Sequence, residues 1–456
     1  MPSEAPLASN KSAHGTWRLI LSVFLPFSAG YYLSYLFRVI NSAISAPLAA
    51  DFGLGAAELG LLASMYFLAL AGAQIPIGVL LDRFGPRRVQ GVLLIIAAGG
   101  ATLFGTATGY FELLAARALI GLGVAAALMA GLKAIVMWFP RERVALVNGY
   151  MIMLGSLGAV TATVPAEWLQ DIMGWRGMFE LLTLATIVVA ALVYVLVPED
   201  RESTCAPDPA QGTLSLKTVY RDPRFWRIAP LSAACIGSSW AMQSLWAGAW
   251  LADVEGFDRQ DLVTQLFQMA LALSVGAWLL GTIADRLRRR GIGAEVLLAV
   301  VAVLFISAQL VILLRLPIPP LLPWMLVAMV GAATVLSYAV VAEYFPTSLA
   351  ARANGALNLL HFAWAFLVQS GIGVIVALWP AESGHYPLAA YQVAFGISVG
   401  FQLITLLWFG WPWLREFGRA FLAALERTQQ SREEEMAFAF ASVEGPIVDS
   451  HKEADW

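Results

Sequence analysis

The sequence predicts an all-α membrane protein with twelve transmembrane helices. Hydrophobic residues make up 59% of the 456 residues and charged residues only 13%, a balance typical of membrane proteins. A bilayer crossing needs about 20 apolar residues, and twelve runs of that length follow one another along the chain. Basic residues are abundant in every second gap between the runs. Two loop motifs occur once in each half of the chain, so the runs divide into two groups of six.

The twelve apolar runs are separated into halves by a polar stretch rich in Pro, Asp, Glu and Ser. The first six lie near 19–43, 57–80, 88–107, 111–138, 144–165 and 177–197. The second six lie near 228–251, 262–283, 294–316, 321–343, 353–378 and 390–413. We therefore expect five parts: an N-terminal tail (1–18), a six-helix bundle (19–197), a linker (198–227), a second bundle (228–413) and a C-terminal tail (414–456).

The positions of the basic residues predict the orientation of these helices. Of the 28 Lys and Arg, 22 lie in the two tails, the linker and the gaps after runs 2, 4, 8 and 10. The remaining gaps hold only Arg176, Arg259 and Arg315. Because basic loops stay in the cytoplasm, we expect a multi-pass protein of the inner or plasma membrane with both termini cytoplasmic. The N-terminus lacks a signal-peptide core, so the first run stays as a helix.

Several functional classes find no support in the sequence. It contains no Gly-x-x-x-x-Gly-Lys phosphate loop, no nucleophile elbow and no histidines at metal-ligand spacing. The two cysteines suggest neither a disulfide framework nor a thiolate site, and the basic residues form no soluble patch for nucleic acid. We therefore expect no enzyme activity, catalytic residue, metal or cofactor. The expected partners are a small substrate and the lipid bilayer, and the expected oligomeric state is a monomer.

Two loop motifs occur once in each half of the chain. The first pair is Gly78-x-x-x-Asp82-Arg83 and Gly281-x-x-x-Asp285-Arg286, at an offset of 203 residues. The second pair is Phe139-Pro140 with Asn148-Gly149 and Phe345-Pro346 with Asn354-Gly355, at an offset of 206 residues. These offsets indicate a repeat of six helices.

The stretch GVLLDRFGPRRV at 78–89 resembles the loop signature of the major facilitator superfamily of secondary transporters. The resemblance covers about residues 18–413 and implies two bundles related by a pseudo-two-fold axis along the membrane normal. It implies that Gly78, Asp82 and Arg83 lock helix 2 against helix 11 at the cytoplasmic side when the protein faces outward. Asp285 and Arg286 would act likewise in the second half, and Gly85 would permit a tight turn.

The ionisable residues in the middle of the runs are cationic, whereas the carboxylates lie at their ends. A charge placed within a bilayer marks a functional candidate, so unpaired positive charge predicts an anionic substrate. Arg38 is the first candidate, because Tyr31, Ser34 and Tyr35 share its helical face. Together they could bind a planar anion. The alternative is an arginine that snorkels to the outer surface with packed tyrosines.

Helix 4 carries two further cations. Arg117-x-x-x-Gly121-x-Gly123-x-Ala125 resembles the superfamily's helix-4 motif, which implies a role for Arg117 in substrate or proton handling. Lys133 lies about 160° away round an ideal helix, so the two cannot face one cavity without a bend. Whether Lys133 faces the cavity stays open.

Polar residues on helices 7 and 11 complete the candidate site. Asn358 and His361 share a stripe on helix 11, and His361 could titrate near neutral pH as the coupling group. A neutral histidine bonded to a neighbouring helix is the alternative. Gln243 and Trp246 share a face of helix 7, the repeat counterpart of helix 1, and could wall a cavity.

The stretches YLFRVIN (35–41) and GWRGMF (174–179) resemble the anion:cation symporter branch, which takes up sugar acids and related anions. That branch often carries an aspartate where Phe37 stands and a second carboxylate where Val124 stands. If those carboxylates carry the proton, this chain must use His361, bring the proton on its substrate, or work as an exchanger or facilitator.

These observations together predict a secondary active transporter that moves a small organic anion, of carboxylate or sugar-acid type, by alternating access. Symport with protons is one mode of coupling. One alternative is a carrier of a neutral or inorganic substrate with structural cations. Another is a non-transporting membrane sensor on the same fold. The substrate, the direction of flux and the coupling ion are left open by the sequence.

Overall fold

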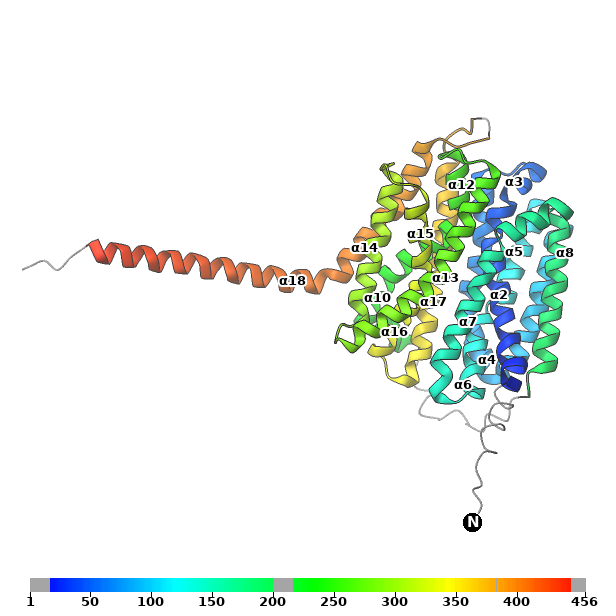
Figure 1. Cartoon of the computed structure of the whole chain (residues 1–456), viewed down its shortest axis with the longest axis horizontal. Helices are drawn as coiled ribbons and strands as arrows, with labels where there is room; N and C mark the ends of the chain where they lie inside the picture. Colours follow the sequence, from blue (N-terminus) through cyan, green and yellow to red (C-terminus); the bar gives the residue numbers. More distant parts are fainter. Residues whose placement is uncertain (1–16, 200–215, 383, 444–456) are drawn as a thin grey trace, which may run out of the picture. The chain divides into compact units, whose positions relative to one another are not determined.

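The computed structural model describes residues 17–199, 216–382 and 384–443. The described chain is almost entirely helical, with one isolated bridge between Glu382 and His385. Residues up to Leu406 form one compact unit and Leu407–Trp456 form a second, which we describe separately. In the first unit the long helices run side by side (Figure 1).

The helices of the first half begin with a π-helical segment, η1. Their bounds are η1 Ile20–Phe24, α2 Leu25–Val39, α3 Asn41–Phe52, α4 Ala56–Thr106, α5 Tyr110–Val124, α6 Ala127–Trp138, α7 Arg141–Thr161 and α8 Val164–Leu196. The predicted helix 4 is thus two consecutive helices, α5 and α6, with a break between them.

The second half contains more and shorter pieces. Their bounds are α9 Leu216–Arg221, α10 Pro223–Ser232, η3 Ala233–Gly237, α11 Ser238–Ala241, η4 Met242–Trp246, α12 Ala247–Asp253, α13 Arg259–Arg289, α14 Ala294–Leu313, α15 Leu321–Val330, η5 Gly331–Ala333, α16 Thr334–Tyr344, α17 Thr347–Val376 and α18 Leu388–Val443. Helix α18 extends into the second unit, where Phe409 packs edge-on against Trp413.

The described helices provide twelve membrane crossings. Ten described helical stretches are long and apolar enough to span a membrane. One of them, Ala56–Thr106, holds two crossings, because Gly85 breaks the helix with a φ of 75°. The twelfth is the span from Pro223 to Asp253, which five short α- and π-helical pieces build together. The predicted twelve-helix fold is therefore confirmed.

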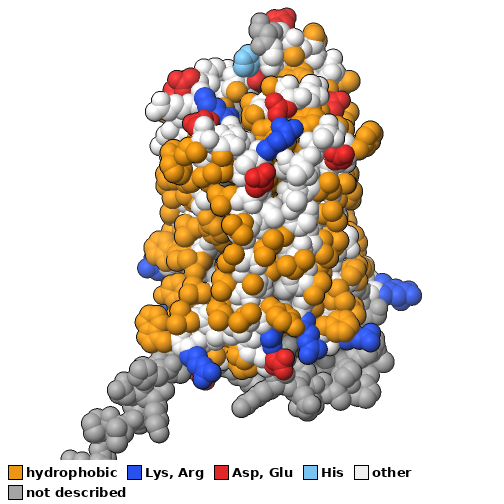
Figure 2. All heavy atoms as spheres, turned by 90° about the vertical axis from the view of Figure 1, so that its right-hand side faces the viewer, with side chains coloured by type: hydrophobic (Ala, Val, Ile, Leu, Met, Phe, Trp, Pro, Cys, Tyr) orange, Lys and Arg blue, Asp and Glu red, His pale blue; other side chains and the backbone are white. Residues whose placement is uncertain are grey.

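The surface fits a bilayer. Figure 2 shows hydrophobic side chains over the middle of one face and charged side chains mostly toward its two ends. We call the end with the turns at Gly85 and Phe139–Pro140 the motif side. The opposite end, with the turns at Gly53 and Gly256, is the far side.

The GWRGMF stretch has a structural role at the far side. Gly174 breaks α8 with a φ of 69°, a conformation that glycine adopts without strain. Directly after it, the Trp175 indole and the Arg176 guanidinium both donate to an Asp51 carboxylate oxygen, at 2.9 and 3.0 Å. These two donors hold the pKa of Asp51 below its usual range. The stretch therefore ties the start of the sixth span to the end of α3.

Close helix packing in the first half depends on Gly158. A Cβ atom there would lie 2.1 Å from the carbonyl oxygen of Tyr32 and 3.0 Å from the amide nitrogen of Leu36. The backbones of α7 and α2 can therefore approach each other only with glycine at this position, as small residues permit in membrane bundles.

We expect Gly158→Ala to destabilise the folded protein by more than about 2 kcal/mol, since backbone must move to admit the methyl group. Gly149→Ala is the matched control on the same helix, because no atom lies within 4 Å of its Cβ position. Thermal unfolding of the purified proteins in detergent measures both. Equal melting temperatures for the two variants would contradict this account of the packing.

Candidate functional site

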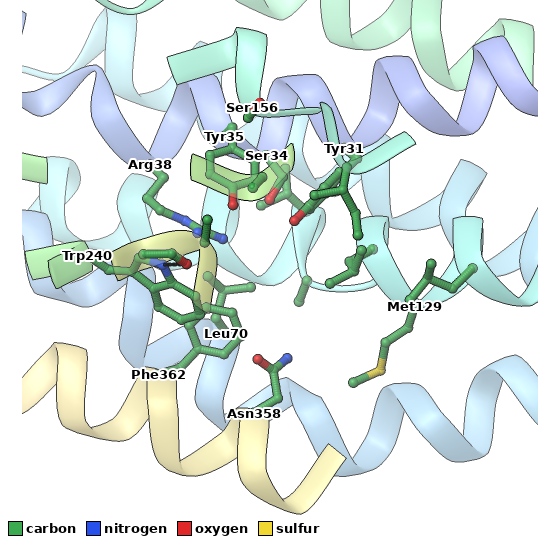
Figure 3. A pocket seen from close by; sticks show the side chains of 18 of the residues that line it. Tyr31, Ser34, Tyr35, Arg38, Leu70, Met129, Ser156, Trp240, Asn358 and Phe362 are labelled. Atoms are coloured by element: carbon green, nitrogen blue, oxygen red, sulfur yellow. Dashed lines mark hydrogen bonds between the residues drawn. The ribbon is translucent and has the colours of Figure 1, made fainter. Parts of the chain in front are cut away.

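A cavity of about 260 Å³ lies between the two halves of the chain (Figure 3). Its wall is mostly apolar, and the polar groups in it come from both halves. The first half supplies Tyr31, Ser34, Tyr35, Arg38, Asn148 and Ser156, and the second half supplies Trp240, Tyr338 and Asn358. The cavity reaches toward the motif side as far as Leu132 and Asn148.

Arg38 lies in this wall with its guanidinium between aromatic rings. Its Cζ atom is 4.6 Å from the ring centroid of Tyr35, 4.7 Å from that of Trp240 and 5.7 Å from that of Phe362. The residue is only 6% exposed, and its Nε atom is buried with no hydrogen-bond partner among the described residues. In Figure 3 the guanidinium points into the cavity, which excludes snorkelling to the outer surface.

Hydroxyl groups, not carboxylates, surround the Arg38 charge. The polar side chains next to it are those of Tyr66, Tyr35 and Tyr31. Tyr66 is itself fixed, because its hydroxyl donates to the carbonyl oxygen of Ser34 at 2.7 Å. Within the described chain no acidic side chain forms an ion pair with Arg38. The cavity therefore presents a positive charge with hydrogen-bonding neighbours, which suits an anion.

Three more predicted site residues line the same cavity. Tyr31 and Tyr35 pack edge-to-face on α2 with ring centroids 5.1 Å apart. Asn358 joins them from α17, where its Oδ1 accepts from the Tyr338 hydroxyl at 2.9 Å. Its Nδ2 donates to Gln74 Oε1 at 2.8 Å, a hydrogen bond that crosses from one half of the chain to the other.

Arg117 lies behind the cavity wall. It is fully buried, and Nη1 donates to the carbonyl oxygen of Phe37 at 3.0 Å. Its guanidinium lies 4.8 Å from the ring centroid of Phe104 and 5.8 Å from that of Phe179. Arg117 is not among the residues that line the cavity. The structure thus places it against the backbone next to Arg38, where it holds α2 in position.

Gln243 and Trp246 also lie outside the cavity wall. Gln243 Nε2 donates to Ser239 Oγ at 2.8 Å, and Trp246 Nε1 donates to the carbonyl oxygen of Gln369 at 3.1 Å. The residue of this span that faces the cavity is Trp240.

The conformation of the seventh span explains why Trp240, and not Gln243 or Trp246, lines the cavity. The span contains two π-helical segments, η3 and η4. A π-helical turn holds more residues than an α-helical turn, so residues on either side of η4 are rotated away from the positions that a wheel of 100° per residue gives them. The π-helical pieces could not be read from the repeat.

His361 is buried next to the cavity but does not line it. Its Nε2 atom lies 2.7 Å from Ser232 Oγ, and its Nδ1 atom has no hydrogen-bond partner among the described residues. Its ring packs edge-on against Trp240, with centroids 5.8 Å apart. The indole of Trp240 thus packs against both His361 and Arg38.

The polar and ring contacts of the described residues of the first loop motif lie within the first half, and none of them is with α17, the predicted helix 11. No atom lies within 4 Å of the Cβ position of Gly78. Asp82 Oδ1 instead accepts from Lys133 Nζ at 2.7 Å, so Lys133 is paired within its own half and lies outside the cavity wall. Arg83 lies over the ring of Phe84, and Gly85 makes the turn with a positive φ.

The motif of the second half is described less completely. Arg286 is exposed at the end of α13, and the side chain of Asp285 lies outside the described residues. The glycine that begins this motif, Gly281, also has no atom within 4 Å of its Cβ position.

At the far side the two halves are in tight contact. A Cβ atom on Gly60 would lie 3.1 Å from Gly373 Cα, and one on Gly373 would lie 2.6 Å from the Ala56 carbonyl oxygen. The Ala56 amide donates to the Tyr386 hydroxyl at 3.1 Å. The cavity is therefore closed on this side.

An ion pair crosses the two halves at the same end. Arg259 on α13 forms two hydrogen bonds to the Glu167 carboxylate on α8. Its Nη2 atom also donates to the carbonyl oxygen of Ala43 at 2.6 Å. All three basic residues that the sequence places in far-side gaps, Arg176, Arg259 and Arg315, are thus used in ion pairs.

Several cavity residues were not predicted as site residues. Asn148 was noted as part of a repeated motif, and its Oδ1 is buried in the wall with no hydrogen-bond partner in the described part of the chain. Trp240, Tyr338 and Phe362 approach Arg38 or Asn358 through the packing of the second half on the first. Their apolar runs gave no signal that separates them from lipid-facing or core aromatics.

The geometry describes a helical membrane protein with a central site between two halves, closed on one side, which is the arrangement of a carrier. A family model described as Major Facilitator Superfamily matches residues 27–369. The chain belongs to this superfamily, and it is a multi-pass membrane transporter. The resemblance inferred from the loop motif is confirmed.

The chain is similar to several known proteins. It is 26% identical over 294 residues to a probable sulfoacetate transporter of Cupriavidus necator, covering 61% of this chain and 67% of the relative. It is 24% identical over 417 residues to the hexuronate transporter of Escherichia coli, covering 86% and 94%. A solved bacterial homolog of the human lysosomal transporter Spinster has a TM-score of 0.67 at 17% identity, covering 86% and 96%, and shows the shared fold.

We expect Glu167→Gln to open the far side more often, because it weakens the ion pair that joins the two halves there. The probe is a cysteine at Ser244, a fully buried position, in a background without Cys205 and Cys235. Labelling by a membrane-impermeant maleimide should become several-fold faster.

The control for this measurement is Asp51→Asn, which removes an ion pair at the same side but within one half. It should leave the labelling rate unchanged. Equal acceleration by both variants would mean that loss of any far-side charge loosens the protein, and the gating role of Glu167 would be wrong.

Proposed function

We propose that this protein moves a small organic anion across the membrane by alternating access, with Arg38 as the anion-binding group. One observation carries the proposal: a buried guanidinium faces a cavity that both halves line, and its described neighbours are hydroxyls and aromatic rings. A carboxylate or sulfonate would supply both the opposite charge and acceptors for a guanidinium fork.

The relatives agree with this substrate class. The names of two of them specify sulfoacetate and hexuronate, and a third is a D-galactonate transporter of Escherichia coli, 24% identical over 312 residues. All three substrates are small organic anions with several oxygen atoms. The hydroxyls and amides of Tyr31, Tyr35 and Asn358 would hydrogen-bond such oxygens beside the anionic group.

The remaining predicted residues receive supporting roles in this proposal. Arg117 fixes the Arg38 backbone, and Gln243 and Trp246 hold the seventh span against its neighbours. Asp82 with Lys133, together with Arg83, Asp285 and Arg286, would form the gate of the motif side when the far side opens. We place the motif side in the cytoplasm of an inner or plasma membrane, because most basic residues gather there. A monomeric carrier remains our prediction.

We expect a small organic anion to stabilise the wild-type protein, and Arg38→Gln to abolish this effect. A ligand at 100 times its Kd stabilises the folded state by about 2.7 kcal/mol. Thermal unfolding of purified protein with D-glucuronate, D-galactonate or sulfoacetate measures the effect. D-glucose is the matched ligand for glucuronate, of nearly the same size but without charge.

The control variant is Arg18→Gln, which removes a charge from an exposed position near the start of the first span. It should respond to the anions as the wild type does. Equal stabilisation by glucose, or an undiminished response of a folded Arg38→Gln variant, would refute the role of Arg38. Flux of the stabilising anion in proteoliposomes separates a carrier from a sensor.

A further inference from the structure

The coupling mode follows from how the charge of Arg38 is compensated, an inference that rests on the proposed function. From the positions of the charged groups we infer that this carrier exchanges one organic anion for another and returns very slowly when empty. The same site binds both anions in turn, one from each side of the membrane.

The first step concerns the empty cavity. Arg38 is the one charged side chain among the described residues that line it. The groups around its guanidinium are the rings of Tyr35, Trp240 and Phe362 and the hydroxyls of Tyr31 and Tyr66. None of these bears a negative charge at neutral pH. An empty, open cavity therefore leaves water as the partner of the cation.

The second step concerns closure. Alternating access requires a moment at which both sides are shut and the cavity holds little water. A guanidinium without a counter-charge is costly in such a low-dielectric space, whereas an ion pair with good hydrogen bonds is much less so. A bound anion therefore lowers the free-energy barrier to closure. When no anion is bound, the carrier must cross the full barrier.

The third step concerns internal substitutes for the anion. A carrier can return empty if one of its own carboxylates pairs with the cation. The acidic residues of this chain lie at the ends of its spans, and the described ones nearest the two gates are already engaged. Asp82 is paired with Lys133 on the motif side, and Glu167 with Arg259 on the far side.

A histidine offers no substitute either. Even a neutral imidazole carries no negative charge to pair with a guanidinium. His361 also hydrogen-bonds Ser232, packs edge-on against Trp240 and does not line the cavity that Arg38 faces. The third of the routes that the sequence left open, exchange, is therefore the one that the geometry favours.

The test compares exchange with net uptake in liposomes that contain the purified full-length protein. One set of vesicles holds millimolar unlabelled D-glucuronate and the other holds buffer, and labelled D-glucuronate is added outside both. Potassium with valinomycin holds the membrane potential at zero. We expect initial uptake into the loaded vesicles to be more than about tenfold faster, since each tenfold in rate needs only a small difference in barrier height.

A pH gradient separates exchange from proton symport. Acidifying the outside should not restore uptake into the vesicles without internal anion. Uptake into those vesicles at the rate of the loaded set, with or without acid outside, would overturn the inference while leaving the transporter function intact. Absence of both fluxes for D-glucuronate, D-galactonate and sulfoacetate would overturn the proposed function and exchange with it.

A variant tests whether the uncompensated charge of Arg38 is the cause of the slow return of the empty carrier. Asn358→Asp places a carboxylate in the cavity wall without changing the size of the side chain. The empty carrier then has its own counter-charge, so the ratio of exchange to net uptake should fall several-fold. Asn358→Ala is the control without added charge: like Asn358→Asp it loses the hydrogen bond donated to Gln74, and it also loses the one accepted from Tyr338. An unchanged ratio in a folded Asn358→Asp protein would contradict charge compensation as the cause.

Discussion

A positive charge held inside a membrane protein must be compensated, and this requirement organises the central site. Arg38 could not remain within a span unless something there stabilised its charge. Ring faces do so in part, because a guanidinium over an aromatic ring gains electrostatic energy. They leave the edge of the guanidinium free for an anion. The substrate's charge, the hydroxyl lining and the kinetics of closure all follow from this incomplete compensation.

The contacts at the far side close the cavity there and are weak enough to be broken again. Gly60 and Gly373 bring two helices into backbone contact beside the buried Trp246 ring. Among the described residues, the polar connections between the halves at this side are the hydrogen bond between Ala56 and Tyr386 and the Arg259 side chain, which pairs with Glu167 and donates to the Ala43 carbonyl oxygen. Each contributes modestly when it can exchange with water. The two halves are thus joined by several weak interactions that can be broken together.

How far the site could be predicted depended on helix regularity and on tertiary packing. Tyr31, Tyr35 and Arg38 lie on a regular α-helix, so their spacing alone placed them on one face. The seventh span winds partly as π-helix, so the same method was less accurate there: it selected Gln243, whereas Trp240 lines the cavity. The positions of the spans and the internal repeat could be predicted, because they follow from the composition of the sequence and the order of its motifs. Pairings such as Lys133 with Asp82 depend on how helices pack, which no local pattern encodes.

The position of the cation between the halves connects binding to conformational change. Tyr35 covers Arg38 from its own helix, whereas Trp240 and Phe362 cover it from the second half. Any movement that opens the far side must shift the second half against α2. The contacts of the guanidinium with the rings of the second half therefore change when the far side opens and the guanidinium becomes accessible from there. A ligand on Arg38 therefore contacts both halves through one charge, and its binding energy differs between the two conformations, as coupling between binding and conformation requires.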